Sequence, residues 1–131
     1  MLIRDATAHD AAEIHALLTP NGWAHRIGDA VELSELLEAS QRKAVAVDGG
    51  KIVGFLRAIT DERSNGYLSM LVVAPEARRK GVATALLRHV VGPDTGITWL
   101  VRAERKGAQE LFSKLGFVAS TAAMERRRRT G

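Results

Sequence analysis

Cysteine is absent from this 131-residue sequence, and its absence excludes a disulfide framework and any thiol nucleophile. The four histidines, His9, His15, His25 and His89, lack the spacing of a zinc motif, so we expect no metal site. The sequence also lacks the run of roughly 20 apolar residues that a membrane-spanning helix needs. No continuous apolar stretch of the kind found in secretion signals precedes Pro20. We therefore expect a cytoplasmic protein that does not contact membranes.

Acidic residues are fewer than basic ones, 15 against 19, which gives a net charge of +4. This surplus equals the charge of one run of arginines, Arg126 to Arg129. A run of like charges is usually a solvated end of a strand or a loose tail. No aromatic residue is interleaved with these arginines to stack on bases, so the charge argues against nucleic acid as the main partner.

Aromatic residues are also scarce, at 5%, but hydrophobic residues as a whole make up 46% of the sequence. That content is enough for one core of ordinary size, whereas two domains sharing 131 residues would each be too small to be stable alone. The sequence contains no internal repeat and no long linker. We therefore expect a single domain that covers residues 1–131.

The N-terminal third predicts a short strand at residues 2–4 and two amphipathic helices. Thr7 and Asp10 have the spacing of a capping box, which begins a helix, and Pro20 ends the apolar pattern of that helix. From Asp29, apolar residues recur at helical spacing up to position 37, which indicates the second helix. Between the two helices we expect a loop that contains Trp23.

The middle of the chain predicts strands at 44–47, 51–59 and 67–73, which follow one another as an antiparallel meander. Asp48-Gly49-Gly50 joins the first two, because these residues tolerate the positive φ of a tight hairpin. Apolar residues then recur at helical spacing from Gly81 to Val90, and a further strand is expected at 97–102. Strand, helix and strand form a βαβ crossover, so strands 67–73 and 97–102 should run parallel and adjacent.

The C-terminal part predicts a helix at 108–115, stopped by Gly116, and two closing strands at 117–119 and 122–126. Ligands favour the carboxyl ends of parallel strands that diverge. A binding site is therefore expected at the end of the two parallel strands, where the chain also turns into its most polar loop.

That loop, the basic segment from Arg78 to Ala83, is the clearest functional signal in the sequence. It lies between a strand and a helix, so free backbone N–H groups point outward from the helix N-terminus. Together with the helix dipole and three preceding cations, these donors suit a diphosphate, and Gly81 would leave its approach unobstructed. A basic loop whose glycine merely opens a helix fits the glycine spacing equally well.

The loop is neither a Walker A motif nor a full dinucleotide-binding glycine motif. The run LSMLVVAPEARRKGVATALL instead resembles motif A of the GNAT family of N-acetyltransferases, whose signature [Gln/Arg]-x-x-Gly-x-[Gly/Ala] is met by Arg78, Gly81 and Ala83. The later run AQELFSKLGF resembles motif B of the same family. The order and spacing of both motifs agree with this resemblance, and so does the order of the expected elements along almost the whole chain.

The resemblance implies an α/β fold in which about four helices flank a mixed sheet whose parallel strands, 67–73 and 97–102, splay apart. It also implies that acetyl-CoA, the acyl donor, lies in the resulting cleft. The first of these strands would pair with the pantetheine amides, an N–H of Val72 or Val73 would face the thioester oxygen, and the basic loop would bind the diphosphate. The cofactor-binding residues expected on this basis are Leu71, Val72, Val73, Arg78, Arg79, Lys80, Gly81, Val82, Ala83 and Thr84.

The sequence departs from the family pattern at the positions where catalytic side chains are usual. Phe112 stands where the family has a tyrosine as general acid, and Ser69 stands where a glutamate often acts as base. Arg105 replaces an asparagine often found near the start of motif B. The remaining catalytic candidates are Glu104, Ser113 and Tyr67, with Asp61 and Glu62 as further possible bases.

The resemblance implies an amine as acceptor, under a wall formed by the loop and helix at residues 20–37. Trp23, His25 and Arg26 are the candidate contacts in that wall. An amino acid, a polyamine, a drug and a protein N-terminus all stay open as acceptors. A non-catalytic acyl-CoA sensor or interaction module is the alternative to an enzyme, because the usual acid and base are missing. Short members of the family often pair, which favours a homodimer by analogy.

Overall fold

The computed structural model describes residues 1–93 and 96–129, and its centre is one five-stranded mixed sheet. The strands are β1 (Leu2–Asp5), β2 (Arg42–Asp48), β3 (Lys51–Thr60), β4 (Asn65–Val73) and β5 (Thr98–Val101). The helices are α1 (Ala11–Leu18), α2 (Ala24–Ile27), α3 (Ala30–Glu38), α4 (Val82–Val91) and α5 (Ala108–Ser113). Short 3₁₀ helices accompany them at Ala8–Asp10, Thr19–Asn21 and Pro75–Ala77. The α/β fold class expected from the sequence is confirmed.

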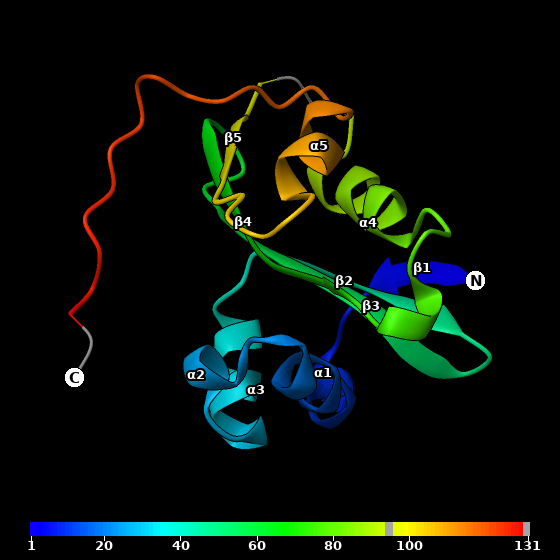
Figure 1. Cartoon of the computed structure of the whole chain (residues 1–131). Coiled ribbons are helices and arrows are strands. Elements are labelled where there is room, and N and C mark those ends of the chain that lie inside the picture. The colour runs from blue at the N-terminus through cyan, green and yellow to red at the C-terminus, as the bar shows by residue number, and fades with distance from the viewer. Residues whose placement is uncertain (94–95, 130–131) are drawn as a thin grey trace.

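The strands lie in the order in which they occur along the chain, from β1 at one edge to β5 at the other. β1 to β4 are antiparallel neighbours, whereas β5 pairs with β4 in parallel. α4 makes the connection between β4 and β5 (Figure 1). The antiparallel meander and the βαβ crossover expected from the sequence are therefore both confirmed.

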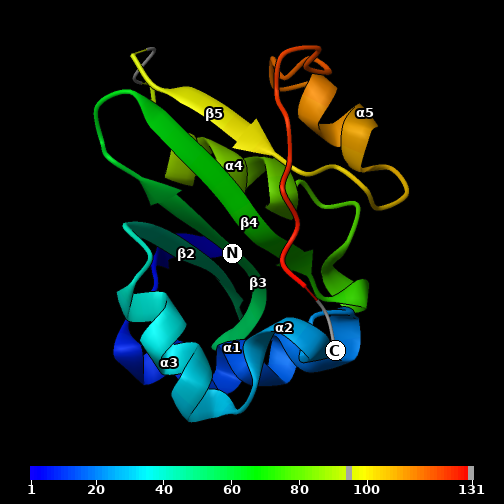
Figure 2. The ribbon, with the colours of Figure 1, turned by 90° about the vertical axis from the view of Figure 1, so that its left-hand side faces the viewer.

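Helices cover both faces of the sheet: α1, α2 and α3 lie on one face, and α4 and α5 lie on the other (Figures 1 and 2). α4 comes close to the sheet at Gly54 of β3, where a Cβ atom would lie 2.9 Å from Val82 Cγ1 and 3.0 Å from Leu86 Cδ1. The buried side of α4 also includes Leu87 and Val90. This packing fixes the N-terminus of α4 beside the carboxyl end of β4.

β4 changes its pairing halfway along its length, and this change opens the sheet. Met70 has a φ of +62°, and the register with β3 shifts between Phe55 and Arg57, which together mark a β-bulge. The pairing with β5 runs only from Asn65 to Leu68. Among the residues that the structure describes, none pairs with the rest of β4, up to Val73, on that side. The splay of the two parallel strands that the resemblance implies is therefore present.

The stretch between α1 and α3 is helical where the sequence predicted a plain loop. α2 spans Ala24–Ile27, and glycines in positive-φ conformations flank it, Gly22 at +92° before it and Gly28 at +63° at its C-terminal end. Ile27 is buried, so this single turn anchors the segment to the core. The prediction missed α2 because a single turn with one buried residue, Ile27, is too short to show a helical period.

The two closing strands predicted at 117–119 and 122–126 are wrong. Residues 117–129 run as an extended segment without strand pairing, and Val118 and Met124 are 87% and 99% exposed. The alternating apolar residues have the pattern of a strand. In the structure, however, the segment is held by side-chain ion pairs to Arg102 and Glu104 and not by backbone hydrogen bonds to a neighbouring strand. Among the described residues, no helix is long and apolar enough to cross a membrane.

Candidate functional site

A cleft of about 580 Å³ opens where β4 and β5 separate. Leu71, Val72 and Val73 of β4 line one side of it, and Gly107, Ala108 and Leu111 around α5 line the other. Arg78 and Ala83 border it at the start of α4, and Trp23, His25 and Arg26 border it from α2. Five of the ten residues expected to bind the cofactor therefore line the cleft. The other five, Arg79, Lys80, Gly81, Val82 and Thr84, lie next to it in the loop and in the first turn of α4.

The basic loop presents free backbone donors to solvent. In the part of the chain that the structure describes, no hydrogen bond uses the N–H groups of residues 79–84, and Ala85 is the first to donate, to the Gly81 carbonyl. Gly81 has a φ of +78° and Arg79 a φ of +65°, so the chain turns twice through the left-handed region before α4 begins. A Cβ on Gly81 would meet nothing within 4 Å, which leaves space for a ligand above the helix end.

The open edge of β4 also carries unpaired backbone groups. Ala74 N–H donates to Val53 of β3 at 2.8 Å, whereas the Val73 carbonyl accepts a hydrogen bond from Arg78 Nε at 3.0 Å. Because the groups of successive residues point to opposite edges of a strand, the N–H of Val73 faces the cleft and that of Val72 faces β3. Of the two donors considered for the thioester oxygen, this register favours Val73.

Two arginines link the rims of the cleft. Arg78 donates to Asn21 Oδ1 at 3.4 Å. Arg105, from the loop before α5, donates to the Asn21 carbonyl at 2.9 Å and lies 4.5 Å from the centre of the Trp23 ring. Arg105, which stands where the family often has an asparagine, therefore links the β5–α5 loop to the α1–α2 connection.

The three catalytic candidates occupy different places. Tyr67 is half-buried in β4 and lines the cleft. Glu104 also lines the cleft, but its carboxylate pairs with Arg102 at 2.7 Å and with Arg127 at 3.2 Å. Ser113 is exposed and faces a second cavity, away from the open edge of β4. The structure therefore brings Tyr67 and Glu104 together in the cleft and leaves Ser113 outside it.

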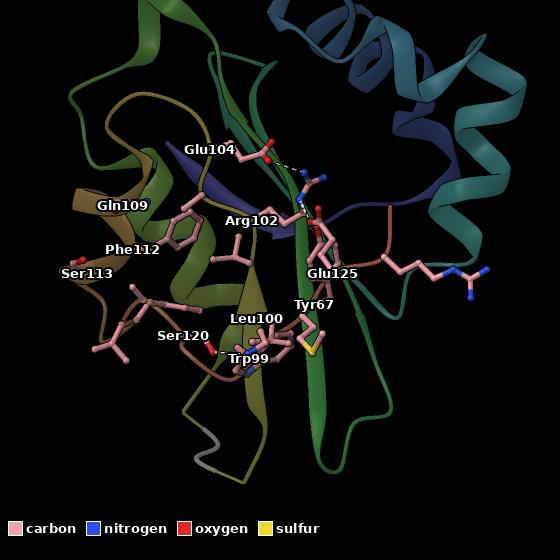
Figure 3. Close-up of a pocket in the computed structure, with 18 residues that line it drawn as sticks. Tyr67, Trp99, Leu100, Arg102, Glu104, Gln109, Phe112, Ser113, Ser120 and Glu125 are labelled. Atoms are coloured by element: carbon pink, nitrogen blue, oxygen red, sulfur yellow. Dashed lines mark hydrogen bonds and ion pairs between the residues drawn. The ribbon is translucent and has the colours of Figure 1, made fainter. Parts of the chain in front are cut away.

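The second cavity, of about 750 Å³, lies between β5, α5 and the extended C-terminal segment (Figure 3). It shares Tyr67, Glu104 and Phe112 with the cleft. Phe112 is 5% exposed and packs edge-on against Phe117, with ring centres 5.3 Å apart, so it acts as a wall of both cavities. The sequence did not indicate this cavity, because the residues that cover it were expected to form strands.

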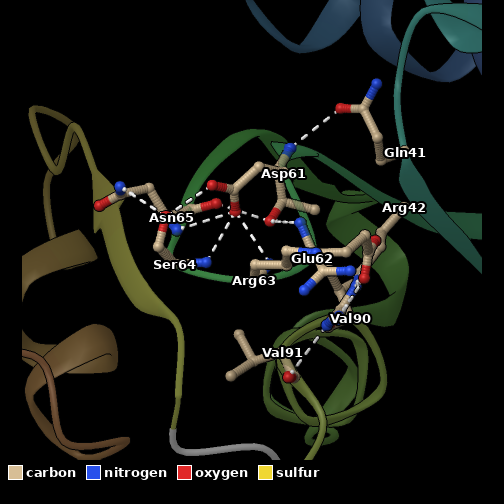
Figure 4. Close-up of polar contacts among 10 residues, drawn as sticks. Gln41, Arg42, Asp61, Glu62, Arg63, Ser64, Asn65, Val90 and Val91 are labelled. Carbon is tan, nitrogen blue, oxygen red and sulfur yellow. Dashed lines mark hydrogen bonds and ion pairs between the residues drawn. The ribbon is translucent and has the colours of Figure 1, made fainter.

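Asp61 and Glu62 lie in the β3–β4 turn, at the opposite end of β4 from the basic loop, and neither lines the cleft (Figure 4). Hydrogen bonds from the Ser64 side chain and from the N–H groups of Ser64, Arg63 and Asn65 hold the pKa of Asp61 well below its ordinary value. Hydrogen bonds from Arg42 lower the pKa of Glu62. Both carboxylates therefore stabilise the turn and are not placed to accept a proton from an acceptor in the cleft.

One charged residue that the sequence analysis overlooked lies in the middle of β3. Arg57 is 5% exposed, and its Nε donates to Ser40 Oγ at 2.8 Å. Burial lowers the pKa of Arg57, with a smaller opposite influence from Tyr67 and a further lowering by Arg26. A lone arginine within the apolar run from Ile52 to Ile59 was the available signal. Among the described residues, no group of three or more histidine or acidic side chains could hold a metal ion.

Comparison with known proteins gives consistent matches. The family model described as Acetyltransferase (GNAT) family matches residues 8–117. The chain is 31% identical over 128 residues to the mycothiol acetyltransferase of Mycolicibacterium smegmatis, a match that covers 93% of this chain and 42% of that protein. It is 32% identical over 115 residues to the mycothiol acetyltransferase of Propionibacterium freudenreichii, covering 88% and 32%. The chain thus spans about a third to two fifths of the length of these curated relatives.

Solved structures give the same result for the fold. A putative acetyltransferase of Xanthomonas campestris superposes with a TM-score of 0.79 at 22% identity, over 98% of this chain and 94% of that one. An aminoglycoside acetyltransferase from an uncultured soil metagenomic sample superposes with a TM-score of 0.72 at 26% identity, over 98% of both chains. The fold is therefore shared with solved structures that are named as acetyltransferases.

Proposed function

Since the chain belongs to the acetyltransferase (GNAT) family, we propose that it forms a single catalytic domain that moves an acetyl group from acetyl-CoA to an amine. The proposal rests on one observation: two neighbouring stretches of backbone have N–H groups that make no hydrogen bond within the described chain. One is the set of N–H groups at residues 79–84, and the other is the edge of β4 after Leu68. Together they match a ligand with a diphosphate at one end and amide groups along its arm.

The chain offers separate parts for each portion of acetyl-CoA. The N–H groups of the loop, together with Arg78, Arg79 and Lys80, would hold the diphosphate, because charge and donors converge there. Val82 is 2% exposed, so only its backbone can take part, and Thr84 is half-buried in the first turn. Leu71 and Val73 would pair with the pantetheine amides as an added strand, with Val72 behind them.

The acetyl thioester supplies an activated carbonyl carbon, to which the amine nitrogen forms a bond as the carbon–sulfur bond breaks. The chain must then hold the amine in line, stabilise charge on the carbonyl oxygen and move one proton. We assign to the oxygen a cleft-facing N–H of β4 that the pantetheine leaves free, and to the departing sulfur the hydroxyl of Tyr67, which lines the same cleft. Glu104 is held by two arginines, so we assign it to proton acceptance only through water. Ser113 would not take part unless the C-terminal segment moves.

Ligand-dependent unfolding tests the proposal directly. Acetyl-CoA at about 100 times its Kd should stabilise the chain by about 2.7 kcal/mol, whereas NAD and ATP at equal concentration should do so much less. A differential scanning measurement with the three ligands makes the comparison. Equal shifts with all three, or none, would contradict a site built for acetyl-CoA.

A non-catalytic acyl-CoA sensor is the second candidate, because Phe112 and Ser69 replace the usual acid and base. The two functions differ in turnover, not in binding. Thiol release from acetyl-CoA with a panel of amines supports the enzyme, and intact binding without release from any amine supports the sensor. Two relatives are named mycothiol acetyltransferases, so the panel includes mycothiol that lacks its acetyl group.

A further inference from the structure

The end of the cleft near α2 is basic, and it lacks a compensating acid. His25 and Arg26 lie there, and Tyr67 and Ser69 of β4 also line the cleft. The only carboxylate among the cleft-lining residues is that of Glu104, and two arginines already pair with it. The guanidinium of Arg26 is exposed and has no hydrogen bond or ion pair in the described part of the chain.

Arg57 adds a second, buried cation behind this wall. It is 5% exposed, and its Nε bonds to Ser40, yet none of the ion pairs of the described residues includes it. It lies opposite Ser69 in the β3–β4 register, and Tyr67 and Arg26 are the charged or titratable groups that influence it. Arg57 does not itself line the cleft, but its register partner Ser69 does, so the charge lies directly behind the lining. A buried charge without an opposite charge is costly, so its place there favours an anion that arrives from outside.

The phosphates of the cofactor do not supply that anion. They are assigned to the loop that follows β4, whereas Arg57 is level with Ser69, upstream of the Met70 bulge. Four residues of strand separate Ser69 from Val73, which is about 13 Å at 3.3 Å per residue. The cation pair is therefore at the acceptor end of the cleft.

We propose that the acceptor is an amine that also carries a carboxylate, and that Arg26 receives this carboxylate, with the buried charge of Arg57 behind Ser69 adding to the attraction, while the amine points along β4 toward the thioester. The inference rests on the proposed acetyl transfer and specifies its substrate class. Guanidinium groups bind carboxylates through two parallel hydrogen bonds, which fixes orientation as well as affinity. An acceptor held at one end in this way would present its nitrogen to a single place in the cleft.

Paired acceptors test the proposal. Amines that carry a carboxylate are compared with the same amines in which a carboxamide replaces it, with rates referred to the free-base fraction of each amine. We expect kcat/KM to be at least about tenfold higher for the carboxylates, the size of one charge-assisted hydrogen bond. Equal or reversed preference would overturn the anionic acceptor and leave acetyl transfer standing. Absence of turnover with every amine would overturn both.

Variants of the two arginines locate the effect. Arg26→Gln and Arg57→Gln should raise KM for the carboxylates and reduce the preference, while KM for acetyl-CoA stays unchanged. Arg26→Glu should reverse the preference, because it places a negative charge at the proposed anion site. Arg63→Gln, in the β3–β4 turn, removes one exposed charge away from the cleft and should leave the preference intact. An unaltered preference in Arg26→Glu would overturn the assignment even if the Arg57 variant does not fold.

Discussion

Gly81 shows how a single backbone conformation can serve a ligand rather than the fold. It begins α4 at a φ of +78° with empty space around its Cα, so packing does not require a glycine there. Positive φ alone costs a non-glycine residue about 1 kcal/mol or more, which a stable domain can tolerate. We expect a larger effect on ligand binding, because a side chain at position 81 would occupy the proposed diphosphate site at the N-terminus of α4.

We predict that Gly81→Glu weakens acetyl-CoA binding by about 100-fold or more, because bulk and a negative charge enter the proposed diphosphate site. The variant should still unfold cooperatively. Calorimetric titration gives the affinity. Gly49→Glu in the β2–β3 hairpin is the matched control, since Gly49 also has positive φ, +57°, and nothing within 4 Å of its Cβ position. Equal affinity in Gly81→Glu and the native chain would remove the loop from the binding site.

Asp10 is the carboxylate whose environment most clearly affects stability. Hydrogen bonds from Arg4, at 2.8 and 2.9 Å, lower the pKa of Asp10 from 3.8 to about 2, and the Thr7 N–H contributes further. Since the folded state lowers this pKa, the stabilisation is fully present above the unfolded value and is lost as the pH falls through the folded value. The difference corresponds to about 2 kcal/mol in the free energy of unfolding.

We therefore predict that Asp10→Asn lowers the free energy of unfolding by about 2 kcal/mol at pH 7 and by much less near pH 2. Urea unfolding at the two pH values measures the effect. Asp48→Asn, at the exposed end of β2, should change stability little at either pH. A loss of the same size for Asp10→Asn at both pH values would show that the ion pair is not the cause.

What the sequence could reveal at this scale depended on how far apart the interacting residues are. Thr7 and Asp10 form the predicted capping box, and Gly81 opens the predicted helix, because each signal lies within one turn of chain. Arg42 was unpredictable: it donates to the carbonyls of Val90 and Val91 at the end of α4, nearly 50 positions away. Arg57 differs from Arg42, because a lone arginine in an apolar run was a local signal, and only its partner Ser40, 17 positions away, could not be predicted.

β4 is the element on which the cleft depends, and two local features shape it. The bulge at Met70 changes its register with β3, and its pairing with β5 ends at Leu68. The sequence predicted the strand but not the bulge, because bulges leave no reliable trace in an apolar run. The strand predicted at 97–102 is one residue longer than β5 at each end. Ile97 and Ala103 continue the apolar pattern beyond the residues that pair.

Gly66 controls how closely β5 packs on β4. A Cβ there would lie 2.3 to 2.8 Å from atoms of the Trp99 ring, and a ring cannot yield as the end of a flexible chain can. At Gly54 the contacts would be 2.9 and 3.0 Å, to the methyl ends of Val82 and Leu86. The two glycines therefore differ in what their replacement displaces.

We predict that Gly66→Ala lowers the free energy of unfolding by about 1–3 kcal/mol, the usual cost of overpacking, and that Gly54→Ala lowers it less. Urea midpoints at an unchanged slope measure both. Hydrogen exchange should quicken in β5 for Gly66→Ala and should not quicken there for Gly54→Ala. A larger loss from Gly54→Ala would show that α4, rather than Trp99, is the rigid neighbour.

At the scale of the whole molecule, the parts of the proposed site follow one another along the chain. The N-terminal helices would form the wall at the proposed acceptor end, the meander carries the core, and the crossover from β4 to α4 provides the basic loop (Figure 2). Most of this order could be predicted from the sequence, because every element of the sheet and every long helix has its own apolar period, whereas the single turn of α2 has none. The final segment could not, since its apolar residues have no described partner strand.

The segment after Ala119 is therefore the part that the molecule should be able to lose. Its described contacts to the rest of the chain include ion pairs from Arg102 to Glu125 and from Glu104 to Arg127, all with substantially exposed side chains. Exposed ion pairs contribute about 0–1 kcal/mol each, which is small beside the stability of a domain of this size.

We predict that a chain ending at Ala119 keeps its circular dichroism spectrum, its cooperative unfolding and its affinity for acetyl-CoA, with a free energy of unfolding lower by about 1–2 kcal/mol at most. The deletion also removes Arg126 to Arg129, so it tests the arginine run. If the full chain binds duplex DNA with a steep salt dependence and the shortened chain does not, nucleic acid is a partner after all. Loss of folding would mean instead that the cavity beneath this segment is part of the core, and that Phe112 and Phe117 need its cover.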